Sequence, residues 1–489
     1  MNNLTLDHSK ETERFWEKEI RELYLVESGI KADLELSSIY AEFGGLFSSE
    51  AVQHLLASTD GSSKERHYLA EFAALRYLRE SVHELDREIN QVSHAAIVLW
   101  EGREVTLPAL PARIAKETDR PRRHELERRR LALVAQLNPW RARRWQVLHT
   151  RVKELGFPDY TTFCDQVRGL NLESARRQAD FILQATRETW LTLLHSELSA
   201  IDLTVEEAES CDLAFLLRAP QFDSLFPKEH LLSTLDATLS GMGIERAKQK
   251  ELQLDIEPRP LKSPRPFCAS IRVPQEIKLV INPRGGQSDY RALFHEAGHA
   301  QHSLHTDARH PFAFRCLGDD SVSEGYAFLF ENLIQDSAWH TRILGMPAPA
   351  NYLRFASFVR LHQARRIAAK VLYECELHQG IDKPAEVYAA RMQAALGVHV
   401  PFEPYLSAVD DGLYCAQYLR ALMLEAQLRN VLQHLFGVEW FANSRANEFL
   451  VNLWRRGQRD NADELAQELG FGGLHAESEY LKGFVCRVF

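Results

Sequence analysis

The stretch Phe294-His295-Glu296-Ala297-Gly298-His299-Ala300-Gln301-His302 contains an H-E-x-x-H motif, whose chemistry depends on helical geometry. Residues four apart on a helix lie one above the other, so His295 and His299 can direct two imidazole nitrogens at one metal ion. Zinc accepts such nitrogens at about 2.0–2.1 Å and keeps a position open for water in catalytic sites. Glu296 is rotated by about 100° around the helix from His295, which predicts a place beside the metal as general base.

Apolar side chains and histidines divide this segment between two helix faces. One face carries Leu293, Ala297, Ala300 and Leu304, and the opposite face carries His295, His299 and His302. Ser288 and Asp289 follow a glycine pair and offer N-cap chemistry just upstream. The pattern therefore predicts a capped amphipathic helix. The alternative to a metal site is a helix with an ordinary polar histidine face.

A second helical segment downstream offers a third ligand, which catalytic zinc sites usually have. Glu324 and Glu331 are seven residues apart in the apolar-periodic segment 323–333 and share a helix face. One of them can coordinate the metal while the other orients a ligand histidine. The alternative for Glu324 is an ordinary solvated glutamate, which the helix dipole favours in a first turn.

Strand patterns are confined to three runs upstream of the motif. Apolar residues alternate in residues 252–256, 269–273 and 277–281, and prolines separate the runs. Elsewhere the periodicity is helical, with long amphipathic segments over residues 11–42 and 63–100. We therefore expect a mainly helical protein with a small β-sheet directly before the H-E-x-x-H helix.

The motif and its spacing resemble the thimet oligopeptidase/oligopeptidase F family of zinc metallopeptidases. The resemblance rests on His295-Glu296-x-Gly298-His299-x-x-His302, with a glutamate twenty-five residues after the second histidine and another seven beyond. It extends to three further segments, residues 265–270, 277–283 and 414–418. The resemblance implies two regions: an N-terminal helical region over residues 1–150, as a lid or channel wall, and a catalytic region over residues 151–489.

This resemblance implies a large helical, two-lobed metallopeptidase with a deep central channel. One zinc ion per chain is expected, and the channel implies short peptides as substrates. A strand edge beside the cleft would pair with the extended substrate backbone. The implied site residues are the metal ligands His295, His299 and Glu324, the general base Glu296, and Glu331 and His302 supporting the ligands.

The donor to the oxyanion is the point where the sequence departs from the family. Peptide hydrolysis needs such a donor besides the metal, and the family supplies a histidine and tyrosines from a Gly-rich loop. Tyr418 and Tyr414 match tyrosine positions, and we expect Tyr418 before Tyr414 to donate. The histidine position falls on Val409 and a further tyrosine position on Ala421. The alternative for both tyrosines is packing between helices with a satisfied hydroxyl.

Two other functions stay open at the level of the sequence. Zinc carboxypeptidases of similar helical fold also carry an H-E-x-x-H helix, so the residues do not separate endo- from exo-cleavage. A helical binding or scaffold protein could have kept the motif without activity, and valine at position 409 favours that reading. The intact motif and Glu324 speak against it, because a decayed site should lose these residues first.

Composition limits the partners. The 489 residues carry a formal net charge of −10, whereas nucleic-acid binders are usually basic. The arginine-rich run 119–130 contains glutamates and fits a solvated helix face better than a nucleic-acid patch. Residues 1–8 lack a signal-peptide pattern, and no stretch approaches about 18 apolar residues. We expect a cytoplasmic protein that binds neither nucleic acid nor membrane, with its seven cysteines reduced.

Overall fold

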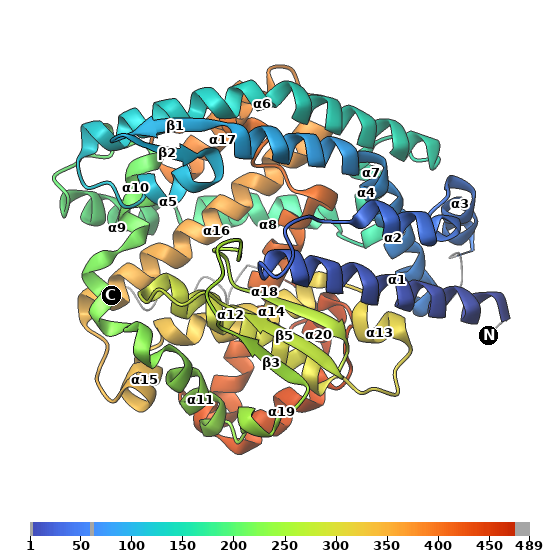
Figure 1. The fold of residues 1–489 in the computed structure, drawn as a ribbon. Coiled ribbons are helices and arrows are strands. Elements are labelled where there is room, and N and C mark those ends of the chain that lie inside the picture. Colours follow the sequence, from blue (N-terminus) through green and yellow to red (C-terminus); the bar gives the residue numbers. More distant parts are fainter. Residues whose placement is uncertain (1–2, 59–62, 475–489) are drawn as a thin grey trace. The chain divides into compact units, whose positions relative to one another are not determined.

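The computed structural model describes residues 3–58 and 63–474, and these are mainly helical with two small sheets (Figure 1). The predicted helical class and the small sheet before the H-E-x-x-H helix are therefore confirmed. The chain forms two compact units. The first contains residues up to Ala74, Pro220–Leu353 and the described residues from Arg420 onward, and the second contains Leu75–Ala219 and Arg354–Leu419. The sequence predicts a boundary near residue 150, between an N-terminal helical region and a catalytic region. This position lies inside the second unit, and the division into those two functional regions stays a prediction.

The first unit contains the three-stranded sheet and most of the shorter helices. Its helices are α1 (Asn3–Glu27), α2 (Leu36–Glu42), α3 (Ser49–Ala57), α11 (Leu231–Gly241), α12 (Gln287–His305), α13 (Phe312–Cys316), α14 (Asp320–Glu331), α15 (Ser337–Trp339), α19 (Ser444–Trp454) and α20 (Ala462–Glu468). Three further helices contribute residues to both units: α4 (Lys64–Ala95), α16 (Ala350–His378) and α18 (Tyr414–Phe436).

The three predicted strands are confirmed, with ends shifted by one or two residues. They are β3 (Leu252–Asp255), β4 (Phe267–Arg272) and β5 (Glu276–Val280), in the order β3-β5-β4. β5 pairs with β3 in parallel and with β4 antiparallel, so β4 is an edge strand. Val273 and Ile277 pack against Ala300 of α12. The sheet thus covers the apolar face of the helix that carries the motif.

The first helical segment is shorter than predicted, because the chain turns at Gly29. The pattern over residues 11–42 predicts continuous helix, whereas α1 ends at Glu27 and α2 begins at Leu36. Gly29 has φ +71°, a left-handed conformation that glycine adopts without strain. A Cβ atom there would lie 2.5 Å from the backbone nitrogen of Lys262. This close approach to another segment explains the break, and a periodicity argument does not detect it.

The second unit contains long helices and a β-hairpin. Its helices are α5 (Leu110–Ile114), α6 (Arg120–Glu154), α7 (Tyr160–Arg168), α8 (Leu172–Ala185), α9 (Arg187–Ser199), α10 (Ser210–Arg218) and α17 (Pro384–Leu396). The helix predicted up to Trp100 ends at Ala95, and β1 (Ile97–Trp100) pairs antiparallel with β2 (Arg103–Thr106). Glu101 and Gly102 have φ +51° and +74°, which is the tight turn that a two-residue hairpin requires.

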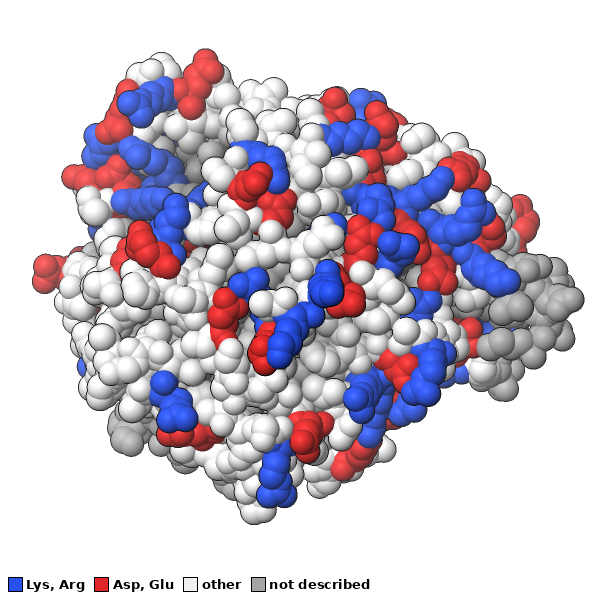
Figure 2. All heavy atoms as spheres, turned by 60° about the horizontal axis from the view of Figure 1, so that its bottom comes forward, with Lys and Arg blue, Asp and Glu red and all other residues white. Residues whose placement is uncertain are grey.

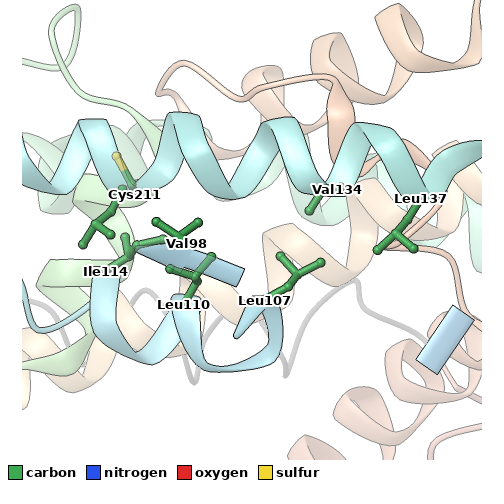
Figure 3. Packing of buried hydrophobic residues seen from close by; sticks show 8 residues of the cluster. Val98, Leu107, Leu110, Ile114, Val134, Leu137 and Cys211 are labelled. Carbon is green, nitrogen blue, oxygen red and sulfur yellow. The ribbon is translucent and has the colours of Figure 1, made fainter. Parts of the chain in front are cut away.

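The hairpin exists because one of its faces joins a core. Figure 3 shows Val98 of β1 among side chains of α5 and α6, with Cys211 of α10 at one end. Val98 is 6% exposed, whereas its neighbours Ile97 and Leu99 are 43% and 63% exposed. This alternation is typical of a strand that is buried on one side.

The arginine-rich run forms the start of α6 and is mostly paired with carboxylates. Arg129 binds Glu125, and Arg130 binds Glu127, each at 2.7 Å. The predicted solvated face needs one correction: Arg123 is only 2% exposed and pairs with the buried Asp212 at 2.8 Å. Elsewhere too, in the view of Figure 2, basic side chains lie next to acidic ones. The expected lack of nucleic-acid binding stays a prediction.

Two expectations concern the chain's environment. Across residues 3–58 and 63–474, no helix is both long and apolar enough to span a bilayer. The six cysteines within these ranges are free thiols, and Cys486 lies outside them.

Candidate metal centre

The start of α12 places the motif on a fixed helix, by a cap that differs from the predicted one. Gly286 precedes the helix and its first residue is Gln287, so Ser288 and Asp289 lie inside the first turn. The carboxylate of Asp289 accepts the backbone N–H of Gly285 at 2.8 Å. Asp289 therefore holds the incoming chain from within the helix instead of acting as the N-cap itself.

A glycine allows α12 and α14 to cross closely. A Cβ atom on Gly298 would lie 2.6 Å from the Cα of Ala327 and 2.7 Å from the carbonyl oxygen of Tyr326. Such distances are below van der Waals contact, so the two backbones approach this closely only because residue 298 has no side chain. The crossing brings Glu324 of α14 opposite the two histidines of the motif.

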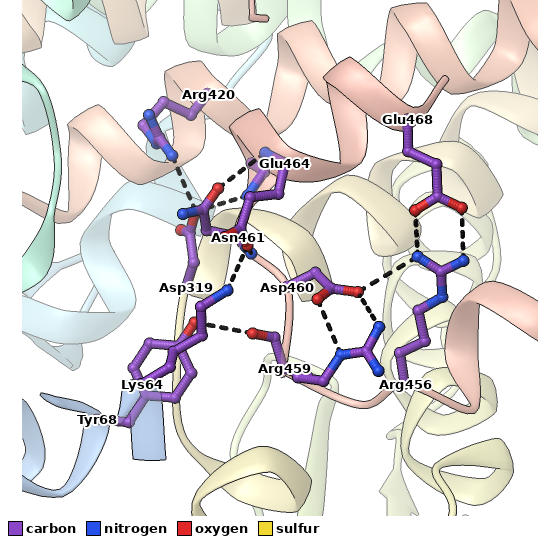
Figure 4. Close-up of polar contacts among 11 residues, drawn as sticks. Lys64, Tyr68, Asp319, Arg420, Arg456, Arg459, Asp460, Asn461, Glu464 and Glu468 are labelled. Atoms are coloured by element: carbon purple, nitrogen blue, oxygen red, sulfur yellow. Dashed lines mark hydrogen bonds and ion pairs between the residues drawn. The ribbon is translucent and has the colours of Figure 1, made fainter. Parts of the chain in front are cut away.

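A polar network anchors the beginning of α14 (Figure 4). Asp319 is its N-cap and accepts the backbone N–H groups of Ser321 and Ala462, both at 3.0 Å. Its carboxylate also lies 2.9 Å from Nη2 of Arg420. Asp319 and Arg420 are 8% and 6% exposed in their side chains, so this is a desolvated, charge-assisted contact. Because Glu324 is little more than one turn further along, the network helps to fix the position of its carboxylate.

The three predicted metal ligands converge. One ligand atom each from His295, His299 and Glu324 lies within 4.8 Å of the others. The Oε2 atom of Glu324 is 3.2 Å from Nε2 of His295 and 3.7 Å from Nε2 of His299. Ligand atoms about 2.0–2.2 Å from a tetrahedral metal are roughly 3.3–3.6 Å apart. The two observed separations bracket this value, so the residues fit a tetrahedral centre with two nitrogen ligands and one oxygen ligand.

The outer nitrogens of both histidines are also engaged. Nδ1 of His295 donates to Oε2 of Glu331 at 2.9 Å, and the other oxygen of Glu331 pairs with Arg291. Nδ1 of His299 lies 2.8 Å from Oγ of Ser323. A hydrogen bond at Nδ1 fixes the ring and leaves the lone pair of Nε2 directed at the metal position.

Two of these supporting residues were not found from the sequence. Ser323 directly precedes Glu324, and Arg291 lies four residues before His295 on the same face of α12. Helical spacing alone could have suggested Arg291. Its partner Glu331 lies on the other helix, however, so the pair depends on how the helices cross.

The charges of the cluster favour a cation. Burial opposes protonation of His295, yet its hydrogen bonds to the carboxylates of Glu324 and Glu331 hold its pKa well above the ordinary value. Burial lowers the pKa of His299 to about 4. Although burial opposes it, Arg291 and His295 lower the pKa of Glu331 to about 2. The ionised Glu331 and the carboxyl group of Glu324 face the rings, and this arrangement suits positive charge, which a divalent ion would supply.

Glu296 lies beside this cluster and against the sheet. Burial, the largest influence, raises the pKa of its carboxyl group to about 7, while the backbone of Cys268 in β4 acts in the opposite direction. Glu296 is not one of the three converging ligands. The role of Glu296 as general base beside a metal stays a prediction.

His302 lies on the predicted helix face and has a different contact. Its side chain is 3% exposed, its Nε2 atom lies 3.1 Å from the carbonyl oxygen of Gly457, and its ring packs against Tyr326. Within the part of the chain that is described, it hydrogen-bonds none of the three converging ligands. It joins α12 to the chain that follows α19.

Tyr414 and Tyr418 begin α18 and belong to the second unit, whereas the converging ligands belong to the first. Their rings contact each other edge to face, with centroids 4.9 Å apart. The role expected for them as oxyanion donors stays a prediction, as does the effect of valine at position 409.

Two other groups of potential ligands in the described residues have a simpler explanation. Glu374, Asp410 and Cys415 surround Lys370, whose ammonium is 2.5 Å from Asp410 and 3.6 Å from Glu374 and already supplies positive charge. His124, Glu209 and Cys211 lie beside the ion pair of Arg123 with Asp212.

No known family model matches the chain, and a search of curated proteins finds no similar sequence.

Proposed function

We propose that the protein is a zinc-dependent peptidase that hydrolyses peptide bonds in short oligopeptides. The observation that carries this proposal is the convergence of two Nε2 atoms and one carboxylate oxygen, with both Nδ1 atoms engaged from outside. Two imidazoles and one carboxylate are the ligand set of many catalytic zinc sites that activate water. When bound, zinc acts as a Lewis acid and lowers the pKa of a water molecule toward neutrality.

The residues of the chain then have separate tasks. Glu296 accepts the proton of the attacking water and delivers it to the leaving amine. Glu331 and Ser323 hold the two ligand rings, so the site needs little rearrangement before reaction. Tyr418, with Tyr414 second, is proposed to donate to the oxyanion.

The edge strand β4 limits where a substrate could pair with the sheet. The carbonyl oxygen of Ser270 already accepts the indole N–H of Trp16 at 3.1 Å. A peptide that adds to the sheet would therefore bind the part of β4 before Ser270. Main-chain pairing of this kind gives affinity with little preference for side chains.

The proposal also includes the architecture and substrates that the resemblance implies. The spacing of the motif resembles the thimet oligopeptidase/oligopeptidase F family, whose two-lobed channel would admit short peptides and exclude folded proteins. Carboxypeptidase action by the same centre is the alternative, and the masses of the products separate the two. The placement of Glu296 beside the three ligands supports an active enzyme over a binding protein.

The experiment is cleavage of a mixture of quenched fluorescent peptides by zinc-loaded protein. We expect turnover by the wild type and a loss of at least about 100-fold in Glu296→Gln, because proton transfer by a positioned base contributes about 10²–10⁴-fold. Glu229→Gln is the matched control, since Glu229 is an exposed glutamate of the same unit. Zinc content is determined for all three proteins.

Each outcome decides the proposal. Cleavage by wild type and Glu229→Gln, with zinc-replete Glu296→Gln inactive, supports it. Zinc-replete wild type that cleaves no peptide, or Glu296→Gln with unchanged turnover, refutes it.

A further inference from the structure

A cavity of about 870 Å³ lies within the second unit and is separate from the candidate metal centre. Its wall is formed by side chains of α6, α9, α16 and α17 and by the segment of residues 397–403 that follows α17. None of the three converging ligands lines it. Its volume is in the range of cavities that bind small molecules.

Arg365 of α16 is the unusual group in this wall. Arg365 is only 2% exposed, and its side chain donates three hydrogen bonds, all to neutral oxygens. Nε donates to the carbonyl of Ala395, and Nη1 donates to the carbonyl of Leu183 and to Oγ1 of Thr186, each at 2.7 Å. Across the described residues, Nη2 has no protein acceptor, although a guanidinium carries two N–H groups there.

The positive charge at this place is only partly compensated. The two carbonyls that bind Arg365 lie in the last turns of α8 and α17, where the helix dipole is negative. No described carboxylate forms an ion pair with Arg365 or with the neighbouring Arg187. Burial, and then repulsion by Arg187, lowers the pKa of Arg365 to about 10. A buried cation with a second cation beside it favours an anion in the adjacent space.

The remaining wall combines a large apolar part with polar and charged side chains, which come from Arg128, Glu209, Gln393, His399 and Glu403. The apolar part comes from Leu131, Trp190, Leu191, Val400 and Phe402. The indole N–H of Trp190 is already bound to the carbonyl of Leu396 at 3.0 Å, so the ring offers apolar surface. Phe402 is 56% exposed, and Leu191 is 37% exposed. Large apolar side chains left open around a cavity are typical of a binding site.

We propose that this cavity binds a small amphiphilic anion, a carboxylate or phosphate monoester attached to an apolar body. Nη2 of Arg365 and the guanidinium of Arg187 bind the anionic group, and the side chains around Trp190 and Phe402 cover the apolar part. The proposal does not rest on peptidase activity, because the cavity is lined by residues of the second unit alone.

The test is titration calorimetry of the full-length protein with three octyl probes: octanoate, octyl phosphate and the neutral octanamide. At least one of the two anions is expected to bind at least about tenfold more tightly than octanamide, a difference of about 1.4 kcal/mol. A charge-assisted contact in a desolvated site contributes at least that much. Whichever anion, octanoate or octyl phosphate, binds more tightly shows whether the natural ligand carries a carboxylate or a phosphate. Equal binding of octanamide, or no binding of either anion, overturns the proposal.

Variants locate the binding site without disturbing the helix ends that Arg365 holds. Arg187→Gln removes an exposed charge that has no described ion-pair partner, and it should weaken anion binding about fivefold or more. Ala394 is exposed on α17 and lines the cavity, so Ala394→Glu places a negative charge there while Ala394→Gln matches its size.

We expect Ala394→Glu to bind the anion at least about tenfold more weakly than Ala394→Gln, with unchanged thermal stability. If Ala394→Glu and Ala394→Gln bind the anion equally well, the proposal is overturned. It is also overturned if Arg187→Gln binds the anion as tightly as the wild type does. Either result shows that the anion binds elsewhere, for example at the metal centre.

Discussion

At the scale of single residues, the supporting hydrogen bonds of the metal centre are as informative as the ligands. Glu331 accepts from His295 and pairs with Arg291, while Ser323 contacts His299. Both contacts decide which ring nitrogen keeps its lone pair for a metal.

Glu331→Gln should therefore lower the affinity for zinc by about 10–100-fold, and Ser323→Ala by a smaller factor, because a neutral acceptor orients an imidazole less strongly than a carboxylate. Competition with a chromophoric chelator measures both affinities. Unchanged affinity in Glu331→Gln would show that Glu331 does not orient the ligand. Circular dichroism controls for loss of fold, since the variant leaves Arg291 without its carboxylate.

A second residue-scale prediction concerns Glu374 of α16, which is fully buried and accepts the backbone N–H of Asp410 at 3.0 Å. Burial raises the pKa of its carboxyl group from 4.5 to about 8. The folded state thus holds a proton that the unfolded state releases above pH 4.5, so this group's contribution is complete at low pH and is lost as pH rises to about 8.

Glu374→Gln should remove this dependence. From pH 5 to 8 the free energy of unfolding of the wild type is expected to fall relative to the variant, by at most about 1.4 kcal/mol per pH unit. Urea denaturation at several pH values measures the difference. Glu376→Gln, which removes a surface partner of Arg391, is the control and should run parallel to the wild type. A constant difference between wild type and Glu374→Gln would contradict the prediction.

At the scale of elements, the site depends on how closely α12 and α14 cross. Gly298→Ala would place a methyl group 2.6 Å from the backbone of Ala327, where nothing can rotate away. We expect a loss of about 1–3 kcal/mol in the free energy of unfolding and a marked loss of zinc affinity, because the helices must separate. Thermal unfolding and chelator competition measure the two effects.

Gly325→Ala is the matched control on α14. Its added carbon would meet the side chain of Leu424 at 3.0 Å, and a side chain can move where a backbone cannot. If Gly298→Ala matches Gly325→Ala in both stability and zinc affinity, the close crossing of α12 and α14 is not needed for the fold or for the metal centre.

At the scale of the whole molecule, local spacing could be predicted and long-range contacts could not. The relative placement of His295, Glu296 and His299 follows from the geometry of a single helix turn. Glu324 and Glu331 share a helix face because they are two turns apart. The turn at Gly29 and the hairpin after Ala95 were missed, because each depends on packing against distant residues. The turn residues Glu101-Gly102 were the available signal for the hairpin.

The same reason explains the rest of the site. Ser323 and Arg291 gain their roles only when two helices cross, and the cavity beside Arg365 combines residues from helices far apart in the sequence. No periodicity in the chain marks such residues in advance.

The most direct test of the metal centre is zinc K-edge X-ray absorption on the purified full-length protein, together with the zinc content. We expect one zinc per chain with nitrogen and oxygen neighbours at about 2.0–2.2 Å, and less than one tenth of that content in the His295→Ala/His299→Ala double variant. Protein without zinc, a sulfur neighbour at about 2.3 Å, or unchanged zinc in the double variant would contradict a centre formed by His295, His299 and Glu324.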